Sequence, residues 1–167
     1  VSWGRFDEGL ATYRKALEID PFSMAIGTDY GIALYYARRY DESIDQLKKL
    51  IEIDPNYIRT YRYLARVYQT TGKFEEALNA HEKRLTLEGG DPQKIATGKQ
   101  AVLNAYRTAG AKGYWSKILE FALDDVSNRR TNGASTLAMI YAQLGERDKA
   151  LEWLDKAVAD QINDEVF

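Results

Sequence analysis

Few residues of this chain could act as acids, bases, nucleophiles or metal ligands. The 167 residues include no cysteine and a single histidine, His81, so the chain itself offers no thiolate nucleophile, cysteine-ligated zinc or two-histidine metal site. No serine has a histidine and an acid at the spacing of a catalytic triad, and no glycine-rich phosphate-binding motif follows a predicted strand. We therefore expect a protein that is not an enzyme and holds no cofactor and no metal.

Adjacent carboxylates are the remaining candidates for cation binding or acid–base chemistry. Examples lie at 41–42, 75–76 and 124–125. Neighbouring side chains on a helix point about 100° apart, and acids are favoured in the first turn of a helix, so we expect these pairs to be solvent-exposed. The glycine-rich segments at 89–91 and 109–113 are expected to form turns and not phosphate-binding loops.

Charge and hydropathy narrow the range of partners. The 23 lysines and arginines nearly balance the 25 aspartates and glutamates, so no overall field attracts nucleic acid or anionic lipid. No apolar segment approaches the ~20 residues that span a bilayer, and the N-terminal residues lack a signal-peptide pattern. The 12 tyrosines could stack on bases, but most lie at predicted packing positions. We expect no nucleic-acid partner and no membrane association, and a cytoplasmic location is favoured.

Three arginines form the clearest candidate for a binding surface. Arg59, Arg62 and Arg66 recur at a spacing of three and four residues, with no acidic neighbour on that helix face in the sequence. Guanidinium groups form forked hydrogen bonds with carboxylates. The cluster therefore predicts a protein or peptide partner with an acidic or carboxylate-ended segment.

An internal repeat predicts the helices that would position these arginines. The sequence Leu-Glu-Ile-Asp before Pro21 recurs as Ile-Glu-Ile-Asp before Pro55, 34 residues later. An aromatic residue followed by two acids keeps the same period at 6–8, 40–42 and 74–76. Apolar residues follow three-and-four spacing and not alternation, which predicts an all-α chain without a sheet.

The repeat resembles the tetratricopeptide repeat, a helix-turn-helix unit of 34 residues. The third unit carries the family's pattern of small and large residues at Tyr61, Leu64, Ala65, Tyr68, Gly72, Phe74 and Ala77. The resemblance implies a right-handed superhelical array of antiparallel helix pairs, an α-solenoid in which small residues let helices approach closely. The expected repeats are about 1–23 (partial), 24–57, 58–92, 93–130 (divergent) and 131–167, in a single array that is part of a longer protein.

The divergent fourth unit and the chain ends call for separate expectations. The fourth unit is predicted to form helices over 93–109 and 113–126, with extra residues in loops at 88–92 and 111–113 outside the packed interface. His81 falls at a position that the family uses inside the helix interface.

The first helix, 4–19, is expected to lack a partner helix on one side. Its apolar side chains at that edge would then be Trp3, Phe6, Leu10 and Tyr13. An exposed apolar edge of this kind predicts self-association through the ends of the array.

The resemblance also implies where a partner would bind. In arrays of this family the first helix of each pair lines a concave groove. Carried onto this sequence, the groove positions are Asp29, Tyr35, Tyr36, Arg59, Arg62, Tyr63, Arg66, Gln69, Gln100, Asn104, Arg107, Asn132, Ser135 and Met139. Thr28 and Ile32 occupy groove positions where chaperone-binding members carry the lysine and asparagine of a carboxylate clamp, so that clamp is absent.

Two functions follow from these observations. The first is a non-catalytic protein-interaction scaffold that holds a peptide or partner domain in its groove. The alternative comes from residues 140–157, which are similar to the final repeat of bacterial multidomain regulators. That similarity implies a regulatory or sensor segment packing on its own output domain.

Overall fold

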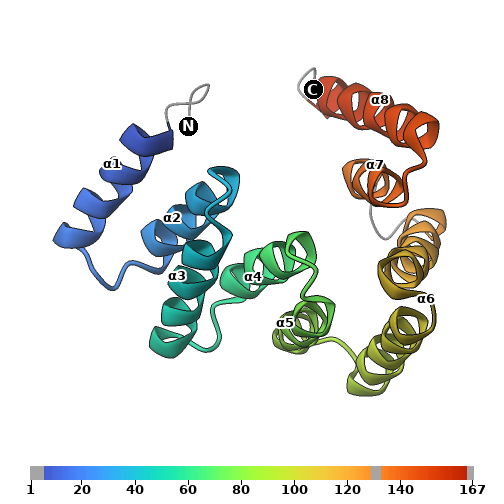
Figure 1. Ribbon diagram of the computed structural model, residues 1–167, viewed down its shortest axis with the longest axis horizontal. Coiled ribbons are helices and arrows are strands. Elements are labelled where there is room, and N and C mark those ends of the chain that lie inside the picture. The colour runs from blue at the N-terminus through green and yellow to red at the C-terminus, as the bar shows by residue number, and fades with distance from the viewer. Residues whose placement is uncertain (1–5, 129–132, 165–167) are drawn as a thin grey trace. The chain divides into compact units, whose positions relative to one another are not determined.

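The computed structural model describes residues 6–128 and 133–164, with side chains up to residue 159. These residues form eight helices and no strand, which confirms the all-α prediction (Figure 1). The helices are α1 (Phe6–Ile19), α2 (Met24–Tyr36), α3 (Tyr40–Ile53), α4 (Ile58–Thr70), α5 (Phe74–Leu87), α6 (Pro92–Ser127), α7 (Ala134–Gln143) and α8 (Arg147–Asp164). They fall into two compact units, divided between Lys99 and Gln100. No helix in the described ranges has both the length and the apolar character that crossing a membrane requires.

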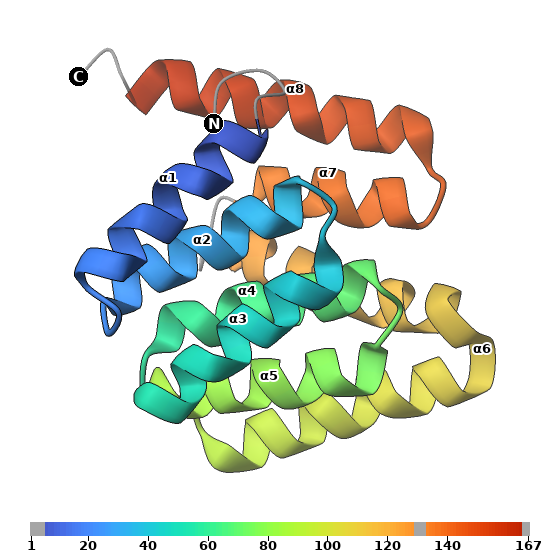
Figure 2. The ribbon, with the colours of Figure 1, turned by 60° about the vertical axis from the view of Figure 1, so that its left-hand side comes forward.

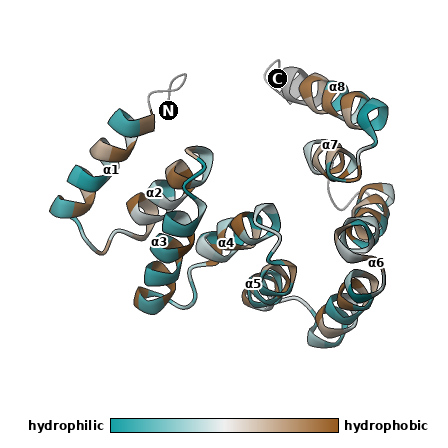
Figure 3. Ribbon diagram, viewed as in Figure 1, coloured by the Kyte–Doolittle hydropathy of each residue, from teal (hydrophilic) through white to brown (hydrophobic). Residues whose placement is uncertain are grey.

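In the first unit each helix packs against its neighbours in the sequence. The contacts run from α1 to α2, from α2 to α3, from α3 to α4 and from α4 to α5 (Figure 2). The helices α3 and α4 are amphipathic, and α3 shows hydrophobic and hydrophilic bands along its length (Figure 3). Ile44 and Leu47 of α3 form one buried cluster with Leu64 and Val67 of α4. This cluster joins the second repeat to the third.

Small residues let the two helices of a pair approach closely, as expected from the repeat pattern. The Ser43 hydroxyl donates a hydrogen bond to the Gly31 carbonyl at 2.7 Å. A Cβ on Gly31 would lie 2.8 Å from the Leu47 side chain, closer than packed carbon atoms come. The equivalent residues Ala65 and Ala77 in α4 and α5 are fully buried.

The turn inside each complete helix pair has a residue with a positive φ angle, but at Gly110 the ψ angle of −145° lies outside the left-handed helical region. The φ angles are 60° at Arg38, 74° at Gly72, 59° at Gly110 and 78° at Gly145. At Arg38 its N–H binds the Tyr35 carbonyl at 3.0 Å, and the next N–H binds the carbonyl of residue 34 at 2.9 Å. The same two bonds recur at Gly72 and Gly145, as in a Schellman helix end. These turns place the repeats in register.

The fourth helix pair corrects one prediction. Its two segments meet at Ala109 and Gly110 within α6, and residues 111–113 are helical and do not form the expected loop. Gly113 lies inside the contact between the segments, because a Cβ there would lie 2.0 Å from the Ala105 carbonyl oxygen. The loop expected at 88–92 is confirmed, since α5 ends at Leu87 and α6 begins at Pro92.

The edge expected beside the first helix is also partly corrected. Leu10 is only 1% exposed, because α1 packs it against Ala33 and Leu34 of α2. Phe6 and Tyr13 remain half-buried. Trp3 lies outside the described residues, so its predicted place at the edge stays a prediction.

In the second unit α7 packs on α8. The buried residues of α7 include Leu137 and Ile140, each fully enclosed. In α6, Tyr114 is fully buried and stacks edge-to-face on Trp115, with ring centroids 5.1 Å apart. Trp115 is also buried, at 4% exposure.

His81 lies in the interface between α4 and α5, as expected. Its Nε2 lies 3.3 Å from the Gln69 amide nitrogen. The pKa of His81 is lowered from 6.5 to about 4. Burial is the main cause and the charge of nearby Arg84 adds to it, whereas Glu88 opposes the shift. The imidazole is therefore neutral at pH 7.

We predict that Arg38→Gly stabilises the chain by about 0.5–1 kcal/mol, because only glycine adopts this left-handed turn without a steric penalty. Thermal or urea denaturation measures the change. The reciprocal variant Gly72→Ala should be destabilised by a similar amount. If Arg38→Gly lowers the stability, the turn is not strained.

We predict that Gly113→Ala destabilises the second unit by about 1–3 kcal/mol, because the added methyl group collides with backbone. Gly98→Ala on the same helix is the matched control, since nothing lies within 4 Å of its Cβ position. That control should raise helix stability by up to about 1 kcal/mol. Equal effects in urea unfolding would contradict the close contact at Gly113.

We predict that protonation of His81 destabilises the fold in acid. Its pKa in the folded chain lies below its ordinary value, so the unfolded chain binds the proton more readily. Stability should fall as the pH drops from 6.5 to about 4, by an amount on the order of 3 kcal/mol. Urea unfolding of the parent chain and of His81→Gln over this pH range measures it. The variant should lose this part of the pH dependence, and identical slopes would count against it.

Candidate functional site

An open groove in the first unit gathers four of the predicted binding residues. The groove has a volume of about 520 Å³ and lies between α1, α2 and α4. We call it the aromatic groove and define it by its lining residues: Phe6, Tyr13, Asp29, Ile32, Ala33, Tyr36, Arg59 and Tyr63. Of these, Asp29, Tyr36, Arg59 and Tyr63 belong to the predicted groove.

An ion pair between residues of neighbouring repeats lines this groove. The Arg59 Nη2 atom donates to Asp29 Oδ1 at 2.6 Å, and both side chains are a little over one third exposed. Partial burial lowers the pKa of Arg59, but the hydrogen bond and charge of Asp29 raise it, and the net shift is upward. No acid lies on α4 itself, as the sequence indicates, and the carboxylate that pairs with Arg59 comes from α2 of the adjacent repeat.

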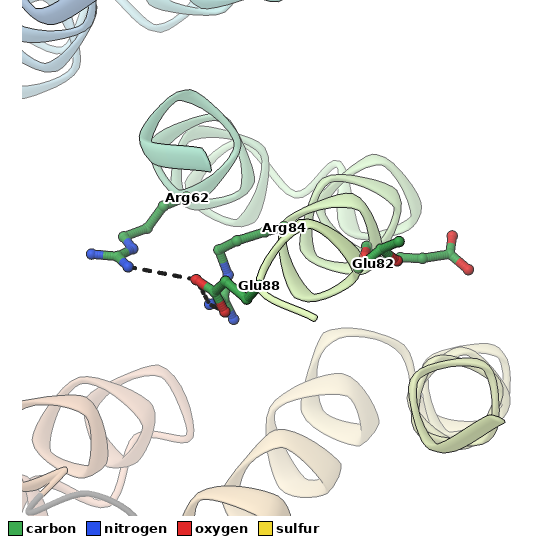
Figure 4. Close-up of polar contacts among 5 residues, drawn as sticks. Arg62, Glu82, Arg84 and Glu88 are labelled. Atoms are coloured by element: carbon green, nitrogen blue, oxygen red, sulfur yellow. Dashed lines mark hydrogen bonds and ion pairs between the residues drawn. The ribbon is translucent and has the colours of Figure 1, made fainter. Parts of the chain in front are cut away.

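The other two arginines lie in different surroundings. Arg62 reaches Glu88 at 3.7 Å, and Arg84 binds the same carboxylate at 2.6 and 2.8 Å (Figure 4). Glu88 lies just after α5, so the carboxylate near Arg62 also comes from another helix. Arg66 is exposed and has no ion-pair partner within the described ranges.

Two of the arginines lie near the ring of Tyr63. The guanidinium carbon of Arg59 lies 5.7 Å from the ring centroid and that of Arg66 lies 5.9 Å from it. Both distances are within the range of a cation–π interaction. Tyr63 therefore holds Arg66 beside the aromatic groove.

Several predicted groove residues make contacts inside the protein. The Tyr35 hydroxyl lies 3.3 Å from the Thr70 hydroxyl, and Gln69 contacts His81. Thr28, taken to face the groove, is fully buried with its hydroxyl 3.3 Å from that of Thr60. This position is corrected: α4 covers Thr28, which helps to join α2 to α4.

The predicted residues of the second unit divide into two groups. Gln100 donates a hydrogen bond to Asn104 at 2.8 Å, and Arg107 is exposed. Ser135 and Met139 line an apolar pocket between α7 and α8. Asn132 lies outside the described residues. The single strip predicted to join all these residues to the arginines of the first unit stays a prediction.

Ala33 lines the aromatic groove without having been predicted, and so do the rings of Phe6 and Tyr13. The sequence places both on one face of the first helix, seven residues apart, which is the signal for a shared surface. Among the residues that the structure describes, no three acidic or histidine side chains come together in a way that could hold a metal ion. The arrangement fits binding through aromatic and charged side chains.

Comparisons with known proteins give the family. Models of the tetratricopeptide repeat match residues 1–23, 23–87 and 133–162, together more than half of the chain. Small glutamine-rich tetratricopeptide repeat-containing protein 2 of Saccharomyces cerevisiae is 30% identical over 130 residues, which are 72% of this chain and 36% of that protein. TPR repeat-containing protein YpiA of Bacillus subtilis is 35% identical over 120 residues, 72% of this chain and 27% of that protein. The chain thus spans about a third of the length of these relatives.

A further relative and the solved structures agree with this. The Hsp70-Hsp90 organizing protein of Triticum aestivum is 26% identical over 115 residues, 67% of this chain and 20% of that protein. A crystal structure of MamA has a TM-score of 0.54 at 18% identity, covering 98% of this chain and 93% of that one. A MamA double mutant has a TM-score of 0.55 at 15% identity, over 96% and 88%. The likeness to MamA concerns the fold. The three family matches show that this chain belongs to the tetratricopeptide repeat family.

Proposed function

We propose that this chain is a non-catalytic interaction scaffold that binds a peptide segment of a partner protein in the aromatic groove. One observation carries the proposal: an open groove of about 520 Å³ has rings from three helices and the Asp29–Arg59 ion pair on its walls. Tyrosine, tryptophan and arginine dominate the binding energy of protein interfaces, because they offer rigid contact area and forked hydrogen bonds.

The aromatic groove favours a ligand with an apolar or aromatic side chain. Tyr36 is 54% exposed and Phe6 and Tyr13 are half-buried, so their rings keep apolar area available for contact. The Asp29–Arg59 pair offers a donor and an acceptor at the same place. A peptide backbone has both kinds of group, so an extended segment complements this wall.

Arg66 is the arginine that supports an acidic preference. Arg59 and Arg62 already face carboxylates of the chain itself, whereas Arg66 is held only against the Tyr63 ring among the described residues. A carboxylate of the ligand beside Arg66 would form a new charge-assisted hydrogen bond. The proposed ligand therefore places an acid next to its apolar side chain.

The relatives support interaction with proteins. The wheat relative is named as an organizing protein of Hsp70 and Hsp90, and that activity belongs to that protein. In this chain Thr28 is buried under α4 and Ile32 is apolar, so no carboxylate clamp of the chaperone-binding kind is proposed. The regulator hypothesis drawn from residues 140–157 stays a prediction, as do the cytoplasmic location and self-association.

We predict that a random peptide display selected on this chain enriches segments with an acid next to an aromatic or aliphatic residue. Arg66→Glu should weaken a selected peptide more than tenfold, because the variant repels the acid. The affinity for the parent chain should fall as salt rises. Isothermal titration calorimetry measures both.

Lys48→Glu on α3 is the matched control, since it makes the same charge change on an exposed residue that does not line the groove. Both variants should keep their melting temperature, because surface substitutions change stability by about 0.5 kcal/mol or less. Equal loss of affinity in both variants, or none in Arg66→Glu, would show that Arg66 is not part of the site.

A further inference from the structure

Two arginines of the third repeat approach one carboxylate of the same chain. Arg62 belongs to α4 and Arg84 to α5, and Glu88 directly follows α5 (Figure 4). The Arg84 Nη1 atom donates to both carboxylate oxygens of Glu88, at 2.6 and 2.8 Å. The Arg62 Nη2 atom lies 3.7 Å from Glu88 Oε1. We call these three residues the arginine cluster.

Glu88 uses only part of the hydrogen-bonding capacity of the two guanidinium groups. Both of its hydrogen bonds come from the single Nη1 atom of Arg84, so it does not form the fork in which two nitrogen atoms bind two oxygens. The Arg84 Nε atom is buried and has no hydrogen-bond partner among the described residues. The distance of 3.7 Å to Arg62 is longer than a hydrogen bond. Arg62 therefore keeps its donors for another acceptor.

The arginine cluster is open to solvent at Arg62 and carries an excess of positive charge. The Arg62 side chain is 62% exposed, whereas the side chains of Glu88 and Arg84 are 32% and 21% exposed. One carboxylate offsets only one of the two guanidinium groups. Arg66, one turn further along α4, has no carboxylate partner within the described ranges and adds to the excess. An acid of another molecule is therefore attracted to this side of α4.

Glu88 stands beside the arginines because of its place in the sequence. It lies four residues after Arg84, the spacing at which side chains on a helix meet. A tethered carboxylate has a high effective concentration at the cation beside it. It also repels a second carboxylate that approaches the same cation. Glu88 therefore opposes the binding of an external acid at Arg62.

We propose that Glu88 is an internal competitor, which occupies the arginine cluster in place of a glutamate or aspartate side chain of a partner segment. The partner's acid binds the exposed donors of Arg62, and Glu88 limits the affinity of this contact. The cluster lies outside the aromatic groove, because none of its three residues lines that groove. It shares with the proposed function only the acidic character of the partner.

A fluorescein-labelled hexaglutamate peptide probes the arginine cluster, because it has no apolar side chain to place in the aromatic groove. Anisotropy titrations of the full chain at an ionic strength of about 0.15 M screen charges more than about 8 Å away. Glu88→Gln should bind the probe at least threefold more tightly than the parent chain, because the amide does not repel it. The amide oxygen still accepts a hydrogen bond from Arg84, so the melting temperature should stay the same.

Glu52→Gln is the matched control, because it makes the same charge change at an exposed residue of α3. It should leave the affinity for hexaglutamate unchanged. Adding Arg62→Gln to the Glu88→Gln chain should abolish the gain. Equal effects of Glu52→Gln and Glu88→Gln, or a gain that survives without Arg62, would mean that Glu88 acts by net charge alone and would overturn the inference. The absence of any gain in Glu88→Gln overturns it as well.

Tyr36→Ala separates this inference from the proposed function. Tyr36 lines the aromatic groove and is 54% exposed, so its loss should weaken a display-selected peptide and leave hexaglutamate binding unchanged. Weaker hexaglutamate binding in this variant would place the probe in the groove and overturn the inference. A gain in Glu88→Gln where display selects no peptide contradicts the proposed function alone. A selected peptide that needs Arg66, together with no gain in Glu88→Gln, contradicts this inference alone.

Discussion

The first unit depends on one constraint, which is that a pair of antiparallel helices cannot cover its own apolar surface. Ile44 and Leu47 project from α3 and become buried only where Leu64 and Val67 of α4 meet them. Removing a core leucine of this kind costs about 2–5 kcal/mol, a large part of the stability of a small domain. The small residues and the repeated turn bring the helices of the first unit close enough for such packing.

The polar contacts between α2 and α4 follow from the same packing. Asp29–Arg59, Thr28–Thr60 and Tyr35–Thr70 each join residues 30 to 35 positions apart, because one repeat period separates the two helices. A partly exposed ion pair contributes little to stability, on the order of 1 kcal/mol or less. Its effect is on the surface, where it fixes Arg59 in place. Of the three arginines of α4, Arg66 has no carboxylate partner among the described residues.

The repeat period predicts much of the fold and less of the site. Helix positions and core residues such as Leu47 follow from local spacing, because one helix face meets one neighbour. The partners of Arg59 and Arg62 do not, since Asp29 and Glu88 come from other helices at distances set by packing. Gly113 is misassigned for a similar reason: glycine gives the same signal in the sequence for a helix stop and for a close helix contact.

Residues at equivalent positions of two repeats can differ in how far they are exposed. Leu151 and Leu154 fit the repeat as well as Ile44 and Leu47 do, yet half of each side chain is exposed. The pattern therefore specifies a surface that needs a cover, and it does not specify the cover. Within the first unit that cover is α4, which the burial of apolar area seats on α2 and α3.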